Sequence, residues 1–140
     1  MTRSATSLGM DNACVSQMLA HAGRAFPKEC VGFLAGIGTN VSVVIPLPNS
    51  AGQKAFFVEP YDQYLAEKRI KENRLELIAI YHSHPQGCAC LSEIDLHFAK
   101  RWDCIQVVIA MSAPDRLSTQ VKAFRPLPAH GPAEIPIEID

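Results

Sequence analysis

The chain has 140 residues, of which 48% are hydrophobic and 19% charged, as in a single globular domain with its own core. Thirteen Lys and Arg stand against fourteen Asp and Glu, and the formal net charge of -1 lacks the positive excess of a nucleic-acid-binding surface. No stretch approaches the ~18 apolar residues of a membrane helix, and the N-terminus lacks the apolar core of a signal peptide. We therefore expect a cytoplasmic protein that has neither nucleic acid nor a membrane as a partner.

Apolar residues at helical spacing, preceded by capping residues or proline, predict three helices. Their ranges are 11–25, 60–74 and 92–102. Short apolar or β-branched runs between turn residues predict the strands. Their ranges are 30–36, 56–58, 75–84, 104–112 and 117–126, and a further strand within 41–49 is expected to end where Pro46 and Pro48 remove ladder donors. This order predicts an α/β fold, with one mixed sheet sandwiched by helices.

The predicted domain boundaries leave short segments at both ends of the chain. Residues 1–10 are expected to form a flexible N-terminus, and residues 11–125 to form the domain. Residues 126–140 form a tail that begins rich in proline and glycine and ends with alternating Ile135, Ile137 and Ile139. This alternation allows one further edge strand in the tail.

The chemistry of the chain is concentrated in His82-Ser83-His84-Pro85 and in the segment that follows. Alternate side chains of a strand share a face, so His82 and His84 present two imidazoles to one point. Asp95 lies one turn into the predicted helix at 92–102, from which its carboxylate can return to the end of the strand. Two imidazole nitrogens and one carboxylate suit Zn²⁺ and leave the fourth tetrahedral position open, as in catalytic zinc sites. Histidines paired only with the backbone are the alternative.

Hydrolysis at such a site also needs a group that moves the proton of the attacking water. From residue type alone the candidates are Glu29, Glu59, Glu76 and Glu93. Glu29 stands out because it adjoins an otherwise apolar strand, although a salt-bridged glutamate at a strand end fits the same pattern. Ser92 lies three residues before Asp95 and is positioned either to donate to an oxyanion or to cap the helix.

These residues resemble the JAMM, or MPN-plus, metalloprotease family. The family motif is a glutamate in the first strand, then His-x-His-Pro, six or seven residues, and Ser-x-x-Asp. This chain carries, in order, Glu29, His82, His84, Pro85, six intervening residues, Ser92 and Asp95. The segment Pro27–Gly36 also resembles the family's Pro-x-Glu-x-x-Gly-x-Leu-x-Gly strand, and Pro48-Asn49 resembles the loop that follows. The resemblance covers residues 11 to about 125.

The resemblance implies a cytidine-deaminase-like MPN fold that holds one Zn²⁺ per chain on His82, His84 and Asp95. It assigns Glu29 to the water and Ser92 to the oxyanion. The implied reaction is hydrolysis of an amide or isopeptide bond at the C-terminal Gly-Gly of a ubiquitin-like protein. Among short bacterial members, the partner is a sulfur-carrier protein, from which cysteine or another adduct is released.

Several alternatives stay open at this point. A non-catalytic MPN module that binds a ubiquitin-like partner is the main one, although such members have usually lost metal ligands. A hydrolase of small amides, similar to a cytidine deaminase, is disfavoured because the chain lacks a Cys-x-x-Cys ligand pair. Asn49 is either a turn residue or a contact to the substrate backbone. A homodimer is compatible with the sequence.

Cys88 and Cys90 lie between the two halves of the motif. They are candidates for extra ligands, for a redox control of the zinc, or for small loop residues, and we favour the last. The five cysteines of the chain lack the spacing of a disulfide framework, which agrees with a reducing compartment.

Overall fold

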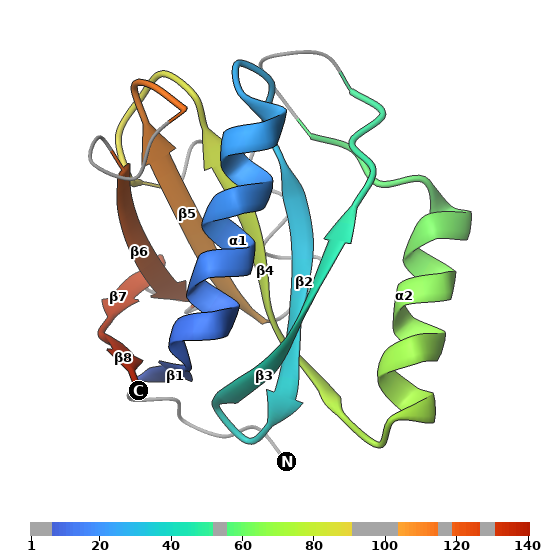
Figure 1. Cartoon of the computed structure of the whole chain (residues 1–140). Helices are drawn as coiled ribbons and strands as arrows, with labels where there is room; N and C mark the ends of the chain where they lie inside the picture. Colours follow the sequence, from blue (N-terminus) through green and yellow to red (C-terminus); the bar gives the residue numbers. More distant parts are fainter. Residues whose placement is uncertain (1–6, 52–55, 91–103, 115–118, 127–130) are drawn as a thin grey trace.

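A single mixed β-sheet organises the chain (Figure 1). The structure, a computed structural model, describes residues 7–51, 56–90, 104–114, 119–126 and 131–140. In chain order the elements are β1 (Leu8–Met10), α1 (Asn12–Ala25), β2 (Val31–Ile37), β3 (Asn40–Leu47), α2 (Pro60–Glu72), β4 (Glu76–His84), β5 (Ile105–Met111), β6 (Thr119–Arg125), β7 (Ala133–Ile135) and β8 (Ile137–Ile139). The strand order is β7-β6-β5-β4-β2-β3-β1-β8.

β4 lies at the centre of this sheet. It pairs antiparallel with β2 and parallel with β5, while β1 is parallel to both β3 and β8. Residues 78–83 of β4 are all buried, as the nearly continuous apolar pattern at 75–84 predicts for a central strand. The predicted mixed sheet is therefore confirmed.

The two ends of the sheet are brought together by the C-terminal tail. β7 pairs with β6 at one end of the strand order, and β8 pairs with β1 at the other end. Only Pro136 separates β7 from β8, so the two edges lie within a few ångströms of each other. The sheet is thus curled almost into a closed ring, and Figure 1 shows β7, β8 and β1 grouped beside one another.

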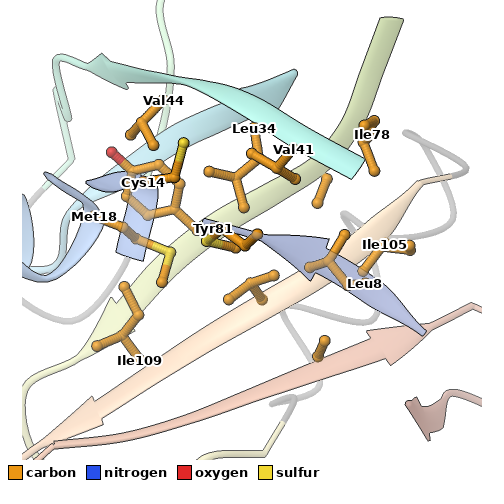
Figure 2. Close-up of a cluster of buried hydrophobic side chains, with 14 of the residues drawn as sticks. Leu8, Cys14, Met18, Leu34, Val41, Val44, Ile78, Tyr81, Ile105 and Ile109 are labelled. Atoms are coloured by element: carbon orange, nitrogen blue, oxygen red, sulfur yellow. The ribbon is translucent and has the colours of Figure 1, made fainter. Parts of the chain in front are cut away.

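The two helices of the described residues cover opposite faces of the sheet. α1 packs its buried residues Cys14, Met18 and Ala22 into the larger core cluster, and Figure 2 shows Cys14 and Met18 beside Tyr81 and Leu34. Asp11 caps α1, since its side chain accepts a hydrogen bond of 2.7 Å from the backbone N–H of Cys14. Apolar periodicity and a capping carboxylate therefore produce this helix as predicted.

α2 lies against the second core cluster, to which it contributes Ala66 and Ile70. Pro60 occupies its first turn, where the missing N–H costs nothing. Tyr64 and Leu65 are exposed. The helix thus buries a narrow stripe of small and branched side chains and turns these two to solvent.

The structure differs from the sequence expectations at three places. Residues 8–10 form the buried strand β1 instead of a flexible segment, because β3 and β8 supply partners for it on both sides. Residues 56–58 form no strand, because Phe57 bonds to the Asn49 side chain and to Ser50. β3 continues through Pro46, which β3 tolerates because β1 pairs only with its first two residues.

The tail contributes two strands, not one. The predicted helix at 92–102 lies outside the described residues. Within the described part of the chain, neither helix has the length and hydropathy needed to cross a membrane.

Candidate metal centre

Three side chains predicted from the sequence meet at one end of β4 and β2. The possible donor atoms of Glu29, His82 and His84 all lie within 4.8 Å of one another. Glu29 and His82 are buried, and His84 is half-buried. The structure therefore brings together residues that lie more than fifty positions apart in the sequence.

Strand alternation aims the two histidines. His82 and His84 face the α2 side of the sheet, whereas Tyr81 belongs to the core on the α1 side. His82 stands opposite Val31 in the β2–β4 ladder, two residues from Glu29. The antiparallel register thus places the start of β2 beside the end of β4, which is what carries Glu29 to the histidine pair.

The ring nitrogens of the histidines are arranged for a shared ligand. Nε2 of His82 lies 3.0 Å from Nε2 of His84. Nδ1 of His84 lies 3.0 Å from the backbone carbonyl oxygen of Cys88. A carbonyl oxygen only accepts, so Nδ1 donates the hydrogen and Nε2 of the neutral ring presents its lone pair. Metal-ligating histidines are usually held by such a bond on their other nitrogen.

The backbone that carries Glu29 is fixed by Ser83, which lies between the histidines. The Ser83 hydroxyl accepts a hydrogen bond of 2.8 Å from the N–H of Cys30, and the Ser83 N–H donates to the carbonyl of Cys30 at 3.1 Å. Ser83 is fully buried. The sequence signal for this role is a polar residue between two histidines at the end of an otherwise apolar strand.

Asn49 and Phe56 complete the surroundings of the centre. The Asn49 side-chain amide donates to the carbonyl of Glu29 at 2.9 Å, and its oxygen accepts from the N–H groups of Ala51 and Phe57, both at 3.0 Å. The ring of Phe56 lies against that of His82, with centroids 4.9 Å apart and planes inclined by 32°. Sequence reasoning assigned no role to Phe56.

Cys88 and Cys90 form a disulfide in the loop after β4, although the cysteine spacing gave no sign of a disulfide framework. Cys88 bonds to His84 through its backbone carbonyl, not its sulfur. The other three cysteines are free. Burial raises the pKa of the Cys30 thiol to about 11, so Cys30 is a neutral core residue near pH 7 even though it follows Glu29 directly.

On the opposite face of β4, the half-buried His21 and the buried Tyr81 form a polar pair. Nδ1 of His21 lies 2.6 Å from the Tyr81 hydroxyl, and the two rings meet edge to face. Burial, and then the charge of Arg24, lower the pKa of His21, while burial raises the pKa of Tyr81. The pair joins α1 to β4 on the face opposite His82 and His84 and is neutral near pH 7.

Ser92 and Asp95, the predicted oxyanion donor and third metal ligand, lie outside the described residues. Among the residues that are described, the donor set of two imidazoles and one carboxylate is one that zinc accepts. The facing Nε2 atoms support this fit, because both can direct lone pairs to one point once the proton between them is lost. His82 and His84 are thus the residues that would hold the ion.

Comparison with known proteins places this chain in a family. A profile of the prokaryotic homologs of the JAB domain, Prok-JAB, matches residues 11–124. A probable TtuB-protein conjugate cleaving protease of Thermus thermophilus is 44% identical over 85 residues, which are 59% of this chain and 56% of that protein. The CysO-cysteine peptidase of Mycobacterium tuberculosis is 31% identical over 105 residues, 73% of this chain and 72% of that protein. The chain thus spans little more than half the length of the Thermus relative.

Solved structures share the same fold. A protein of Desulfitobacterium hafniense superimposes with a TM-score of 0.79 at 28% identity, over 95% of this chain and 92% of that chain. A JAB1/MPN domain protein of Archaeoglobus fulgidus superimposes with a TM-score of 0.61 at 19% identity, over 94% and 99%. The expected MPN fold is therefore confirmed, and the chain belongs to the Prok-JAB family, the prokaryotic homologs of the JAB domain.

Proposed function

We propose that the chain is a zinc-dependent peptidase that hydrolyses the amide bond after the C-terminal Gly-Gly of a ubiquitin-like or sulfur-carrier protein, releasing cysteine where cysteine is the adduct. The observation that carries the proposal is the convergence of a buried carboxylate, Glu29, on the facing Nε2 atoms of His82 and His84. The Prok-JAB family and the two relatives named as a peptidase and a conjugate-cleaving protease support it.

Each residue of the site has a separate role in the proposed reaction. His82 and His84 hold the ion, and Asp95 is proposed as the third ligand. When bound, Zn²⁺ supplies Lewis acidity, which polarises a carbonyl and lowers the pKa of water to ~7. The Glu29 carboxylate accepts a proton as water attacks the amide carbon and returns it to the leaving nitrogen, so the C–N bond breaks to a carboxylate and an amine. Ser92 is proposed to donate to the oxyanion.

The burial of Glu29 suits this role as a base. The residue is 8% exposed, and its main chain is held on both sides by Ser83 and Asn49. A carboxylate with little access to bulk water exchanges its proton mainly with groups inside the site. A rigid main chain keeps the carboxylate within reach of the histidine pair, which general base catalysis requires.

The choice of substrate is supported by the names of the relatives. One is a CysO-cysteine peptidase and the other a probable TtuB-protein conjugate cleaving protease. Both names describe proteases that cleave CysO or TtuB from a partner to which it is joined. We propose the same class of partner for this chain, with an extended C-terminal tail entering the site in strand-like form.

The test is mass spectrometry of a Gly-Gly carrier protein bearing a C-terminal cysteine, incubated with the full chain with and without a zinc chelator. We expect loss of the cysteine mass, abolished by the chelator and restored when zinc is added back. A carrier that stays intact with a fully metallated chain would contradict the proposed substrate. A chain that binds the carrier but neither binds zinc nor cleaves would support the alternative, a non-catalytic binding module.

A further inference from the structure

The side-chain amide of Asn49 joins two segments that touch the metal centre from different sides. Its nitrogen donates to the carbonyl of Glu29 at 2.9 Å, and its oxygen accepts from the Phe57 N–H at 3.0 Å. A third bond, from the Ala51 N–H, uses the second lone pair of the same oxygen. Both lone pairs of the amide oxygen therefore accept hydrogen bonds from within the chain.

The bond to Phe57 determines where the neighbouring Phe56 lies. Phe56 is 8% exposed and packs in the core cluster on the α2 side. Its ring rests on the imidazole of His82 at a centroid distance of 4.9 Å. The segment that carries this ring has no strand partner in the described structure and is held through Asn49 and Ser50. Asn49 thus controls the packing of a ring against a metal ligand.

The bond to Glu29 determines the direction of the catalytic carboxylate. The N–H of Cys30 and the carbonyl of Glu29 belong to adjoining positions of the main chain, and Ser83 and Asn49 hold them in turn. Without the Asn49 bond, the carbonyl of Glu29 loses this hold, while the bonds between Ser83 and Cys30 on the β4 side remain. The carboxylate then gains freedom to swing away from the histidines.

We propose that Asn49 is a positioning residue that aligns Glu29 and, through Phe56, the imidazole of His82. It would then act through these residues and not by the substrate contact expected from the sequence. The inference rests on the proposed function for its effect on turnover, but its effect on zinc affinity stands independently. Partners that orient metal ligands from outside the coordination sphere typically change metal affinity or activity by ~10–100-fold when removed.

The test compares Asn49→Ala with Ser50→Ala in the full chain. Ser50 is the matched control, because its hydroxyl bonds at 3.1 Å to the Phe57 carbonyl that its own backbone N–H also holds at 3.0 Å, so Ser50→Ala leaves that carbonyl bonded and does not touch the Asn49 bond to Glu29. Zinc affinity is measured by competition with a chromophoric chelator in the absence of substrate. For Asn49→Ala we expect zinc affinity to fall ~10–100-fold and kcat to fall with KM nearly unchanged. Ser50→Ala should match the wild type in all three quantities.

Two further variants keep the test decisive if Asn49→Ala folds poorly. Asn49→Asp retains the acceptor for Phe57 but loses the donor to Glu29, so it should lower kcat more than zinc affinity. Phe56→Leu keeps an apolar side chain but removes the ring on His82, so it should lower zinc affinity. An Asn49→Ala chain with wild-type zinc affinity and a raised KM would overturn the proposal in favour of substrate contact. If Asn49→Ala lowers zinc affinity as expected but the wild-type chain cleaves no carrier, the proposed function is refuted and the positioning role of Asn49 stands.

Discussion

At the scale of single residues, the hydrogen bonding of His84 determines which of its ring nitrogens faces the site. Its Nδ1 donates to the carbonyl of Cys88, which leaves Nε2 as the atom that faces His82. The bond comes from the main chain of residue 88, so the Cys88 side chain is not needed for it. The identity of the metal ligands and the contribution of the cysteines are therefore separable by mutation.

We predict that His84→Ala abolishes stoichiometric zinc binding, because it removes one of the two facing imidazole nitrogens. The double variant Cys88→Ser, Cys90→Ser should keep a zinc content near that of the wild type, because the hydrogen bond to Nδ1 of His84 is retained. Metal analysis of the dialysed proteins distinguishes the two. Loss of zinc in the double variant would make the sulfurs ligands, and full metallation of His84→Ala would show that the ligand set is wrong.

His21 makes the stability of the fold depend on pH. Its pKa is lowered from 6.5, first by burial and then by Arg24, so protonation favours the unfolded chain. Its stabilising contribution is complete above the unfolded pKa of ~6.5 and is lost as the pH falls through the folded pKa. We predict that His21→Gln, which can still bond to the Tyr81 hydroxyl, shows a shallower loss of unfolding free energy below pH ~6.5. Equal slopes in urea titrations of both zinc-loaded proteins would contradict this.

At the scale of the elements, local pattern predicted most of the secondary structure. The apolar periodicity of α1 and the β-branched and apolar runs of β2, β4 and β5 agree with the structure, because each segment's burial follows its own pattern. The pattern failed for residues 56–58, where the hydrogen bonds of Phe57 go to Asn49 and Ser50. Such side-chain partners cannot be found from periodicity.

The packing of β2 on β4 gives a prediction at this scale. Gly32 stands opposite Tyr81, and a Cβ added to Gly32 would overlap the Tyr81 ring. The ring is fully buried and its hydroxyl is bonded to His21, so it cannot move aside. Gly32→Ala should lower the free energy of unfolding by ~1–3 kcal/mol. Among the described residues, the new Cβ of Gly87→Ala meets only His84 Cβ, at 3.8 Å, and urea unfolding should show a change within ~0.5 kcal/mol. Equal stability of the two variants would contradict this packing.

At the scale of the whole molecule, the tail closes the sheet and also anchors its first strand. The Leu8 N–H donates to the carbonyl of Pro136 at 2.9 Å, and the Asp140 N–H donates to the carbonyl of Met10 at 3.1 Å. These contacts join the two ends of the sequence. Sequence periodicity does not encode such pairings, which is why residues 1–10 were expected to be flexible.

Deleting residues 131–140 should therefore destabilise the domain far more than removal of a surface tail. The deletion takes away β8, one of the two strand partners of β1, and the buried side chain of Ile135. Burial of one such side chain alone contributes about 1.5–3 kcal/mol. We predict a loss of at least about 2 kcal/mol in urea unfolding. Unchanged stability would show that β7 and β8 are not integral to the fold.

The site, like the fold, was predictable from the sequence where it depends on neighbouring residues and not where it depends on pairing between distant segments. Alternation along β4 predicted that His82 and His84 share a face. Residue type alone left four glutamates as candidates for the base, and only the resemblance to a known family selected Glu29. The reason is physical: Glu29 reaches the histidines through the antiparallel register of β2 and β4, which depends on pairing between distant segments.

The measurement that tests the central claim most directly is zinc content and turnover of Glu29→Gln beside the wild type, on the same preparations. We predict one zinc per chain in both proteins and cleavage of the Gly-Gly carrier by the wild type only, because the amide of Gln cannot accept and return the proton. A Glu29→Gln protein that cleaves at the wild-type rate would contradict the account.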